Sequence, residues 1–338
     1  MELRNILQAF GLAAGDFSID RISAGYINHT YKLTNGISYV LQRLNKQVFK
    51  QPDVVAGNIR TAASYLAQHH PDYLFLSPVR TRAGQEMMYD DEGFPWRLFP
   101  YINNTITVNK VETEQEAFNA ASGFARLTKK LAGADTSLFH ATIERFHDLT
   151  WRLEQFEEAL LKTSAERKEK AAAAIAIAQR YIYLVDHYRA QVAGGALKLR
   201  IMHNDTKINN ILFDATTRKD VCVIDLDTLM PGYFIYDLGD MIRTFVSPVD
   251  EEVKDPSQIR LRQNIYDAVV KGYLSEMNNI LTEEEKMSIE FSGQMMTYIM
   301  GLRMLTDFLN GDIYYQTTYP GQNLVRAANQ LRLLELLT

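Results

Sequence analysis

The stretch HNDTKINNILFD, residues 203–214, groups four side chains of different chemistry ahead of an apolar run. They are His203, Asp205, Lys207 and Asn210, which lie within eight positions. A polar turn would account for the asparagines, but it would not call for an acid and a lysine at this spacing. The stretch therefore predicts a loop that carries chemistry.

A second informative stretch is VCVIDLDT, residues 221–228, which is apolar and β-branched up to Asp225. Such a run predicts a short buried strand that ends in an acid. Asp225 follows Asp205 by 20 residues. The polar loop alone is a weak motif, and its combination with a strand-terminal acid makes it specific.

The spacing Asp-x-Lys-x-x-Asn is that of the catalytic loop of kinases. Phosphoryl transfer depends on positioning and electrostatics, because the transferring group carries spread negative charge. Asp205 would accept the proton of the attacking hydroxyl, and Lys207 would lie near the γ-phosphate. Asn210 and Asp225 offer the oxygen ligands that Mg²⁺ prefers. We therefore predict ATP and Mg²⁺ as cofactors.

Length and composition limit the class of protein. The 338 residues are 46% hydrophobic and 23% charged, which is typical of a soluble globular protein, and the length predicts two lobes. The net charge of −5, without a block of Lys or Arg, argues against a nucleic-acid partner. The single cysteine fits a reducing compartment. No signal peptide is visible, and the apolar tract at 171–178 is too short to cross a membrane. We expect a cytoplasmic protein with no membrane partner.

The pattern of strands and helices changes near residue 100. Residues 1–98 predict a β-rich nucleotide-binding lobe, with short strands at 19–49 and 75–102 and one helix between them. Residues 99–103 would form the hinge, and 104–338 would form a helical lobe that carries the catalytic loop and the acceptor site. Helices are expected at about 113–133, 149–162, 165–192, 258–279 and 283–310, and from about 321.

The catalytic stretch, HNDTKINNILFD at 203–214, resembles the aminoglycoside phosphotransferase and choline kinase superfamily, as does VIDLDTLMPGYFIYDLGDMIRT at 223–244. The match is closer to the N-acetylhexosamine 1-kinases and extends through GYINHTY, RFHDLTWRLEQF, GLRMLTDFLNGDIYY and YPGQNLVRA. The resemblance implies an α+β, protein-kinase-like fold of two lobes, with ATP, Mg²⁺ and transfer to the anomeric hydroxyl of GlcNAc or GalNAc. It also implies that Asp205 is the base, that Asn210 and Asp225 are metal ligands, and that Arg303 contacts the sugar.

The first lobe departs from the protein-kinase pattern at the phosphates. It has no GxGxxG, and Gly25 stands alone between Ala24 and Tyr26. Protein kinases have a lysine in the third strand of this lobe, and the corresponding residues here are Gln42 and Arg43. Because neighbouring side chains of a strand point to opposite faces, only one of the two can face the nucleotide. We favour Gln42. Nucleotide contacts are therefore expected from the loop backbone at Ala24, Gly25 and Tyr26 and from Gln42.

The hinge should bind the edge of adenine, which needs one backbone donor and one acceptor. Pro100 has no N–H and can offer only its carbonyl. The donor is therefore expected from Tyr101 or Ile102.

The acceptor site is expected around Arg303, whose planar fork of donors suits two sugar oxygens. An i,i+4 pair of Arg303 with Asp307 is the competing interpretation. Tyr26 and Thr244 would also line the sugar pocket, and both depart from the residues that the N-acetylhexosamine kinases carry there. Acceptor selectivity is therefore open.

Two acids near the start of a helix, Asp237 and Asp240, are interpreted as groups that complement the helix dipole, with Arg243 as their partner.

Other functions of the protein are also considered. An aminoglycoside, choline or homoserine could be the acceptor, the chain could be a nucleotide-binding pseudokinase, or IDLDT could be the DxD of a glycosyltransferase. The glycosyltransferase hypothesis gives the catalytic stretch no function.

Overall fold

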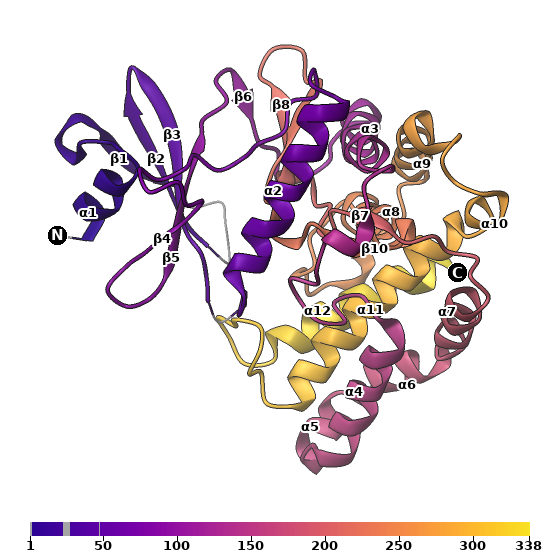
Figure 1. The fold of residues 1–338 in the computed structure, drawn as a ribbon. Helices are drawn as coiled ribbons and strands as arrows, with labels where there is room; N and C mark the ends of the chain where they lie inside the picture. The colour runs from indigo at the N-terminus through magenta and orange to yellow at the C-terminus, as the bar shows by residue number, and fades with distance from the viewer. Residues whose placement is uncertain (1, 23–27, 47) are drawn as a thin grey trace.

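The computed structural model describes residues 2–22, 28–46 and 48–338, which form a sheet-containing part and a helical part (Figure 1). The N-terminal part is built on an antiparallel sheet with the strand order β1-β2-β3-β5-β4. The predicted α+β class is confirmed. The strands of this sheet are β1 (Ser18–Ile22), β2 (His29–Asn35), β3 (Ile37–Arg43), β4 (Met88–Tyr89) and β5 (Pro95–Pro100).

One face of the sheet carries a small apolar core. Leu33 on β2, Leu41 on β3 and Leu98 on β5 are fully buried and pack in one cluster with the helix α1 (Glu2–Ala9). Gly36 joins β2 to β3 with a φ of 63°, which glycine adopts without a steric penalty. The other face of the sheet is left for contacts with the rest of the chain.

Within the region 75–102, where short strands are predicted, residues 75–81 do not form one. In this segment Val79 forms an isolated bridge to Leu98, and its N–H donates to the Leu98 carbonyl at 2.7 Å. Pro78 has no N–H, so it cannot extend the pairing along the segment. The segment runs beside β5 as irregular chain.

The helix α2 (Pro52–His69) lies between the sheet and the helical part (Figure 1). Its buried residues Val55, Ile59 and Leu66 belong to the large core formed by the C-terminal helices. Asn58 donates to the carbonyl of Leu229 at 2.8 Å. The helix therefore connects the N-terminal sheet to the region around VCVIDLDT.

Two small sheets frame the polar stretches. One has the order β6-β8-β9, and the other pairs β7 with β10. Their strands are β6 (Thr105–Ile106), β7 (Arg200–Met202), β8 (Ile211–Asp214), β9 (Asp220–Val223) and β10 (Met230–Gly232).

Helices form in every region where the sequence predicts them. The helix expected at about 113–133 is capped by Thr113, whose hydroxyl accepts the N–H of Glu116 at 3.2 Å. The helices are α3 (Glu114–Lys130), α4 (Leu149–Lys162), α5 (Ala165–Lys170), α6 (Ala172–Arg180), α7 (Tyr183–Ala193), α8 (Phe234–Phe245), α9 (Gln263–Met277), α10 (Glu283–Lys286), α11 (Ile289–Leu309) and α12 (Gln322–Leu337).

The single helix predicted at 165–192 is wrong, because this region forms α5, α6 and α7. The chain turns at Ala171 and Tyr181, both of which are buried. The Tyr181 N–H bonds three residues back, to Ala178, as in a tightened last turn. Each turn lets the next helix keep its apolar side on the core. Within the described chain, every helix lacks the length or the apolar character needed to cross a membrane.

Candidate active site

The hairpin of β8 and β9 brings the two polar stretches together. Ile211 at the start of β8 lies opposite Val223 at the end of β9. One residue further out, the N–H of Ile224 donates to the Asn210 carbonyl at 2.9 Å. His203 closes the connection, because its Nε2 lies 2.9 Å from the Ile224 carbonyl. Asp225 therefore follows directly from a residue that the catalytic stretch holds on two sides.

Helix α8 fixes the catalytic stretch through Asp237. The carboxylate of Asp237 accepts the N–H of His203 at 3.0 Å and that of Asn204 at 2.7 Å. Asn204 has a φ of 64°, and these bonds support that rare conformation. Asp237 lies in the first turn of α8, as the interpretation as a helix-dipole acid requires, and its carboxylate also binds the neighbouring loop, which that interpretation did not include. Burial raises the pKa of Asp237 to about 6, against the lowering effects of His203 and the two amide bonds.

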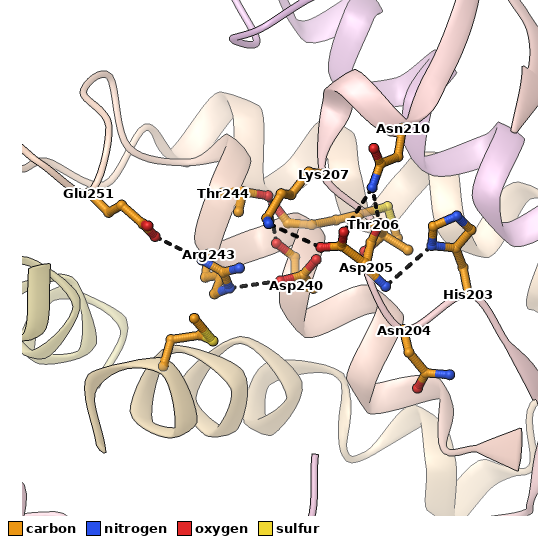
Figure 2. A network of polar contacts seen from close by, with 12 residues as sticks. His203, Asn204, Asp205, Thr206, Lys207, Asn210, Asp240, Arg243, Thr244 and Glu251 are labelled. Carbon is orange, nitrogen blue, oxygen red and sulfur yellow. Dashed lines mark hydrogen bonds and ion pairs between the residues drawn. The ribbon is translucent and has the colours of Figure 1, made fainter. Parts of the chain in front are cut away.

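Asp205 is held between two of its predicted partners (Figure 2). Its Oδ1 lies 3.2 Å from Lys207 Nζ, and its Oδ2 accepts Asn210 Nδ2 at 3.0 Å. Burial opposes ionisation of Asp205, but the nearby Lys207 and His203 outweigh burial and hold its pKa below the usual value. Asp205 in turn raises the pKa of Lys207 to about 12. At neutral pH the site therefore presents a carboxylate beside an ammonium group.

Asp225 lies in an environment rich in negative charge. It is solvent-exposed and has a left-handed backbone with a φ of 58°. Although part of the residue is open to solvent, the chain packed around its carboxyl group desolvates it, and this, followed by the charges of Asp227 and Asp205, raises its pKa to about 7. Among the described residues, no three His, Cys, Asp or Glu side chains converge to hold a metal alone. Asp225 and Asn210 nevertheless fit Mg²⁺, which takes one or two protein oxygens and completes its shell with water and phosphates.

The sheet contributes a buried cation that the sequence analysis missed. Arg97 on β5 is opposite Gln42 on β3 and donates to Gln42 Oε1 from Nε at 3.0 Å and from Nη2 at 2.9 Å. Its Nη1 lies 2.5 Å from Asp227 Oδ1. Gln42 is therefore on the face of the sheet directed at VCVIDLDT. Arg43 is on the opposite face, where it pairs with Asp90 at 3.1 Å.

The connection after β5 removes one of the two predicted adenine donors. The N–H of Tyr101 already donates to the Ser38 carbonyl at 3.0 Å, so Tyr101 is wrong as the donor. Pro100 is the last residue of β5, and the Ile102 carbonyl accepts the Thr105 hydroxyl at 2.7 Å. The backbone N–H of Ile102 is the predicted donor that remains. Ala24, Gly25 and Tyr26 lie outside the described residues.

The competing interpretation of Arg303 is also wrong. Asp307 does not pair with it, because its carboxylate accepts the backbone N–H groups at residues 313–315, at 2.8–3.0 Å. Arg303 lies over the ring of Phe146, 4.9 Å from its centroid, and 5.7 Å from that of Tyr315. No carboxylate of the described chain forms an ion pair with Arg303, which is partly exposed. Its guanidinium therefore remains available to a ligand.

Arg243 is occupied within the protein (Figure 2). It is buried and pairs with Asp240 Oδ1 at 2.7 Å and with Glu251 Oε2 at 3.6 Å. The predicted partnership with Asp240 is confirmed. Thr244 is partly exposed on the same helix, and its hydroxyl donates to the Asp240 carbonyl at 2.6 Å. Thr244 therefore presents its methyl group and an oxygen lone pair more readily than a donor.

A buried histidine joins the acceptor side to the catalytic stretch. His147 Nε2 lies 2.8 Å from the Asn204 carbonyl, and its ring is 5.2 Å from that of Tyr236. Burial is the main reason that its pKa falls to about 3, and the nearby Arg303 and Arg152 lower the pKa further. The ring is therefore neutral, with Nε2 as the donor to Asn204.

Comparison with known proteins agrees with this arrangement. The model of the phosphotransferase enzyme family matches residues 18–269, and the chain belongs to this family. Similar solved structures include an aminoglycoside phosphotransferase from Alicyclobacillus acidocaldarius (TM-score 0.59, 13% identity, 98% of this chain and 94% of that one). Choline kinase LicA from Streptococcus pneumoniae is also similar (TM-score 0.55, 13% identity, 94% and 93%). A third is an amicoumacin kinase in complex with AMP-PNP and Ca²⁺ (TM-score 0.59, 13% identity, 94% and 88%). The predicted superfamily and its protein-kinase-like fold are confirmed.

Proposed function

We propose that this phosphotransferase uses ATP and Mg²⁺ to phosphorylate the anomeric hydroxyl of an N-acetylhexosamine, GlcNAc or GalNAc, to the sugar 1-phosphate. The observation that carries the proposal is the guanidinium of Arg303, which contacts Met300 Sδ and the ring of Phe146 but has no carboxylate partner among the described residues. A rigid fork of N–H donors suits neighbouring sugar oxygens. The sequence resemblance to the N-acetylhexosamine 1-kinases supports the same acceptor.

The position of Arg303 also argues against choline and aminoglycosides. Quaternary ammonium ligands bind over the faces of aromatic rings. Arg303 already lies near the rings of Phe146 and Tyr315. A cationic acceptor would have to take the place of the Arg303 guanidinium at these rings or bind beside it against charge repulsion. A neutral sugar meets no such repulsion. A sugar is therefore the better match for this side of the site.

Asp205 is the proposed general base. Its low pKa leaves it ionised at neutral pH, ready to accept the proton of the anomeric hydroxyl as that oxygen attacks. Lys207 beside it would stabilise negative charge on the transferring phosphoryl group. Asn210 and Asp225 would hold Mg²⁺, which when bound neutralises charge on the phosphates.

The proposed nucleotide site lies between the sheet and the catalytic stretch. The Ile102 N–H would donate to adenine and the Pro100 carbonyl would accept from it. Gln42 faces the Asp227 side of the sheet, where phosphates would bind. The loop backbone at Ala24, Gly25 and Tyr26 would complete the phosphate site. Tyr26 and Thr244 are proposed to line the sugar pocket.

The test is a coupled ADP-release assay over a panel of acceptors, with and without Mg²⁺. GlcNAc or GalNAc should give Mg²⁺-dependent turnover, whereas choline, homoserine and aminoglycosides should give none. Phosphorus NMR should show the product phosphate coupled to the anomeric hydrogen.

Two controls make the assay specific for the anomeric position. The methyl glycoside of the active sugar keeps every other hydroxyl and should not react. Asp205→Asn should lower turnover about 10²–10⁴-fold, as expected on removal of a general base. Phosphorylation of the methyl glycoside, or faster turnover with choline, would refute the proposed acceptor chemistry.

A further inference from the structure

A buried ion pair connects the N-terminal sheet to the acidic turn that follows β9, residues 225–228. Protein kinases place a lysine on the third strand of this lobe, and here that region of β3 carries Gln42, held by two hydrogen bonds from Arg97 on the neighbouring strand. The remaining terminal nitrogen of Arg97 lies 2.5 Å from Asp227 Oδ1. Both charged side chains are 3% exposed, so water screens the pair only weakly.

Asp227 is held by the sheet on both of its carboxylate oxygens. Oδ1 faces Arg97, and Oδ2 accepts the side-chain amide of Asn28, just before β2, at 2.9 Å. The side-chain Oδ1 of Asn28 accepts the backbone N–H of Asn45 at 3.0 Å, beyond the end of β3. The second acid of IDLDT is therefore committed to contacts with the sheet.

The turn that contains Asp227 also contains the proposed metal ligand. Asp225 stands two residues earlier, with a left-handed backbone that leads into the short 3-10 helix Leu226–Thr228. A carboxylate in such a turn changes direction with any rotation of the backbone beside it. The contacts of Asp227 restrain that rotation from the side of the sheet, opposite the contacts that His203 and Asn210 make with Ile224.

We propose that Arg97 and Asp227 are positioning residues, whose buried ion pair fixes the Asp225 turn relative to the nucleotide-binding sheet. Arg97 orients Gln42 and the acidic turn with a single rigid guanidinium, which a shorter or flexible group would not do. Misplacement by about 1 Å of a group that positions a substrate can cost about 10²-fold in rate. This inference rests on the proposed use of Mg²⁺ and ATP, and it does not depend on the identity of the acceptor.

The test is a double-mutant cycle with Arg97→Gln, Asp227→Asn and both together. AMP-PNP binding is measured by calorimetry with and without Mg²⁺. In each single variant, the gain in AMP-PNP affinity on adding Mg²⁺ should be about tenfold smaller than in the wild type. The AMP-PNP affinity without Mg²⁺ should stay unchanged. The double variant should be no weaker than either single one, because either substitution already removes the same interaction.

Two further variants separate positioning from general damage to the fold. Arg97→Lys keeps the charge near Asp227 without the rigid fork, and it should recover only part of the Mg²⁺-dependent affinity. Arg43→Gln, on the opposite face of the sheet, should bind as the wild type does. Thermal unfolding of every variant shows whether it is folded under the conditions of the binding measurement.

Additive losses in the cycle would overturn the proposal, because they would mean that Arg97 and Asp227 act separately. A strong loss in Arg97→Gln with none in Asp227→Asn would also overturn it, since Arg97 would then bind the phosphates directly. Failure of the proposed acceptor would look different. The wild type would bind AMP-PNP with Mg²⁺ and phosphorylate no N-acetylhexosamine, and the binding cycle would still decide the role of the ion pair.

Discussion

The two sides of Asp205 carry opposite excesses of charge. On the phosphate side, Asp225 and Asp227 share one nearby buried cation, and desolvation followed by the charges of Asp227 and Asp205 raises the pKa of Asp225 to about 7. On the acceptor side, Arg152 lies close to Arg303, and burial followed by the charge of Arg303 lowers the pKa of Arg152 to about 10. Each side therefore holds charges that repel one another.

This contrast identifies what each side lacks. Perturbed pKa values of this kind gather at functional sites, because a bound ligand relieves the repulsion that shifts them. A bound cation would reduce the repulsion between the acids. Hydrogen-bond-accepting oxygen atoms of a ligand would reduce the repulsion between the arginines. The same reasoning is consistent with the proposal that Mg²⁺ and a sugar bind on opposite sides of the proposed base.

The largest effect is expected from Asp225→Asn, which weakens the acidic side. Mg²⁺-dependent nucleotide binding should be lost, because the metal loses its strong anionic ligand. Without Mg²⁺ the same variant should be more stable than the wild type at neutral pH. The folded-state pKa of about 7 is raised above the ordinary 3.8, so the wild type loses stability as the pH rises from about 4 to 7, and solvent screening of this exposed residue keeps the loss small.

Calorimetry with AMP-PNP and thermal unfolding at pH 5 and pH 8 test both parts of this prediction. Glu158→Gln, on an exposed stretch of α4, is a control for the loss of one acid far from the site. Unchanged Mg²⁺ dependence in Asp225→Asn would remove Asp225 from the metal site and would leave the acidic side without its proposed ligand.

The sequence could predict that the polar side chains of residues 203–210 lie together, because their contacts are local. Asp205, Lys207 and Asn210 lie within six positions, and their spacing alone places them around one carboxylate. The hairpin that adds Asp225 is also short. Arg97 could not be found in this way, because it meets Gln42 across 55 residues and only the strand order β3-β5 makes them neighbours.

Asp237 shows a different limit. An acid in the first turn of a helix has the same appearance in sequence whether it only complements the dipole or also accepts amides from another loop. The packing of α8 against β7 decides between these, and that packing is tertiary. Similarly, the spacing of Arg303 and Asp307 permits an i,i+4 pair, and only the fold of residues 313–315 shows that Asp307 is occupied.

The next effect concerns the cationic side. Arg303→Lys replaces a planar fork with a point charge, so it should keep the charge and lose paired hydrogen bonds to the sugar. We expect the sugar KM to rise about 10–100-fold, the range for losing hydrogen bonds to a charged group, with the ATP KM nearly unchanged. Arg189→Lys, an exposed arginine on α7 that pairs with Asp186, is the matched control. An unaffected sugar KM in Arg303→Lys would take this arginine out of the acceptor site.

The smallest effect tests the neutral histidine between the two sides. His147 contacts the catalytic stretch through Asn204, and burial with the nearby arginines lowers its pKa to about 3, whereas its ordinary value is 6.5. The folded-state pKa is depressed, so protons bind the unfolded chain first as the pH falls below 6.5, and stability is lost over that window. By pH 5.5 the loss is about 1 kcal/mol relative to pH 8.

His147→Gln keeps a donor for the Asn204 carbonyl and cannot titrate. Its unfolding free energy should therefore fall less than that of the wild type between pH 8 and pH 5.5, whatever its stability at pH 8. His140→Gln, at an exposed position, should leave the pH dependence of the wild type in place. Chemical denaturation at several pH values measures all three proteins. If His147→Gln and the wild type lose the same stability on acidification, then His147 is charged in the folded protein. The acceptor side would then hold one more positive charge, and the contrast between the two sides of Asp205 would be larger than the neutral ring allows.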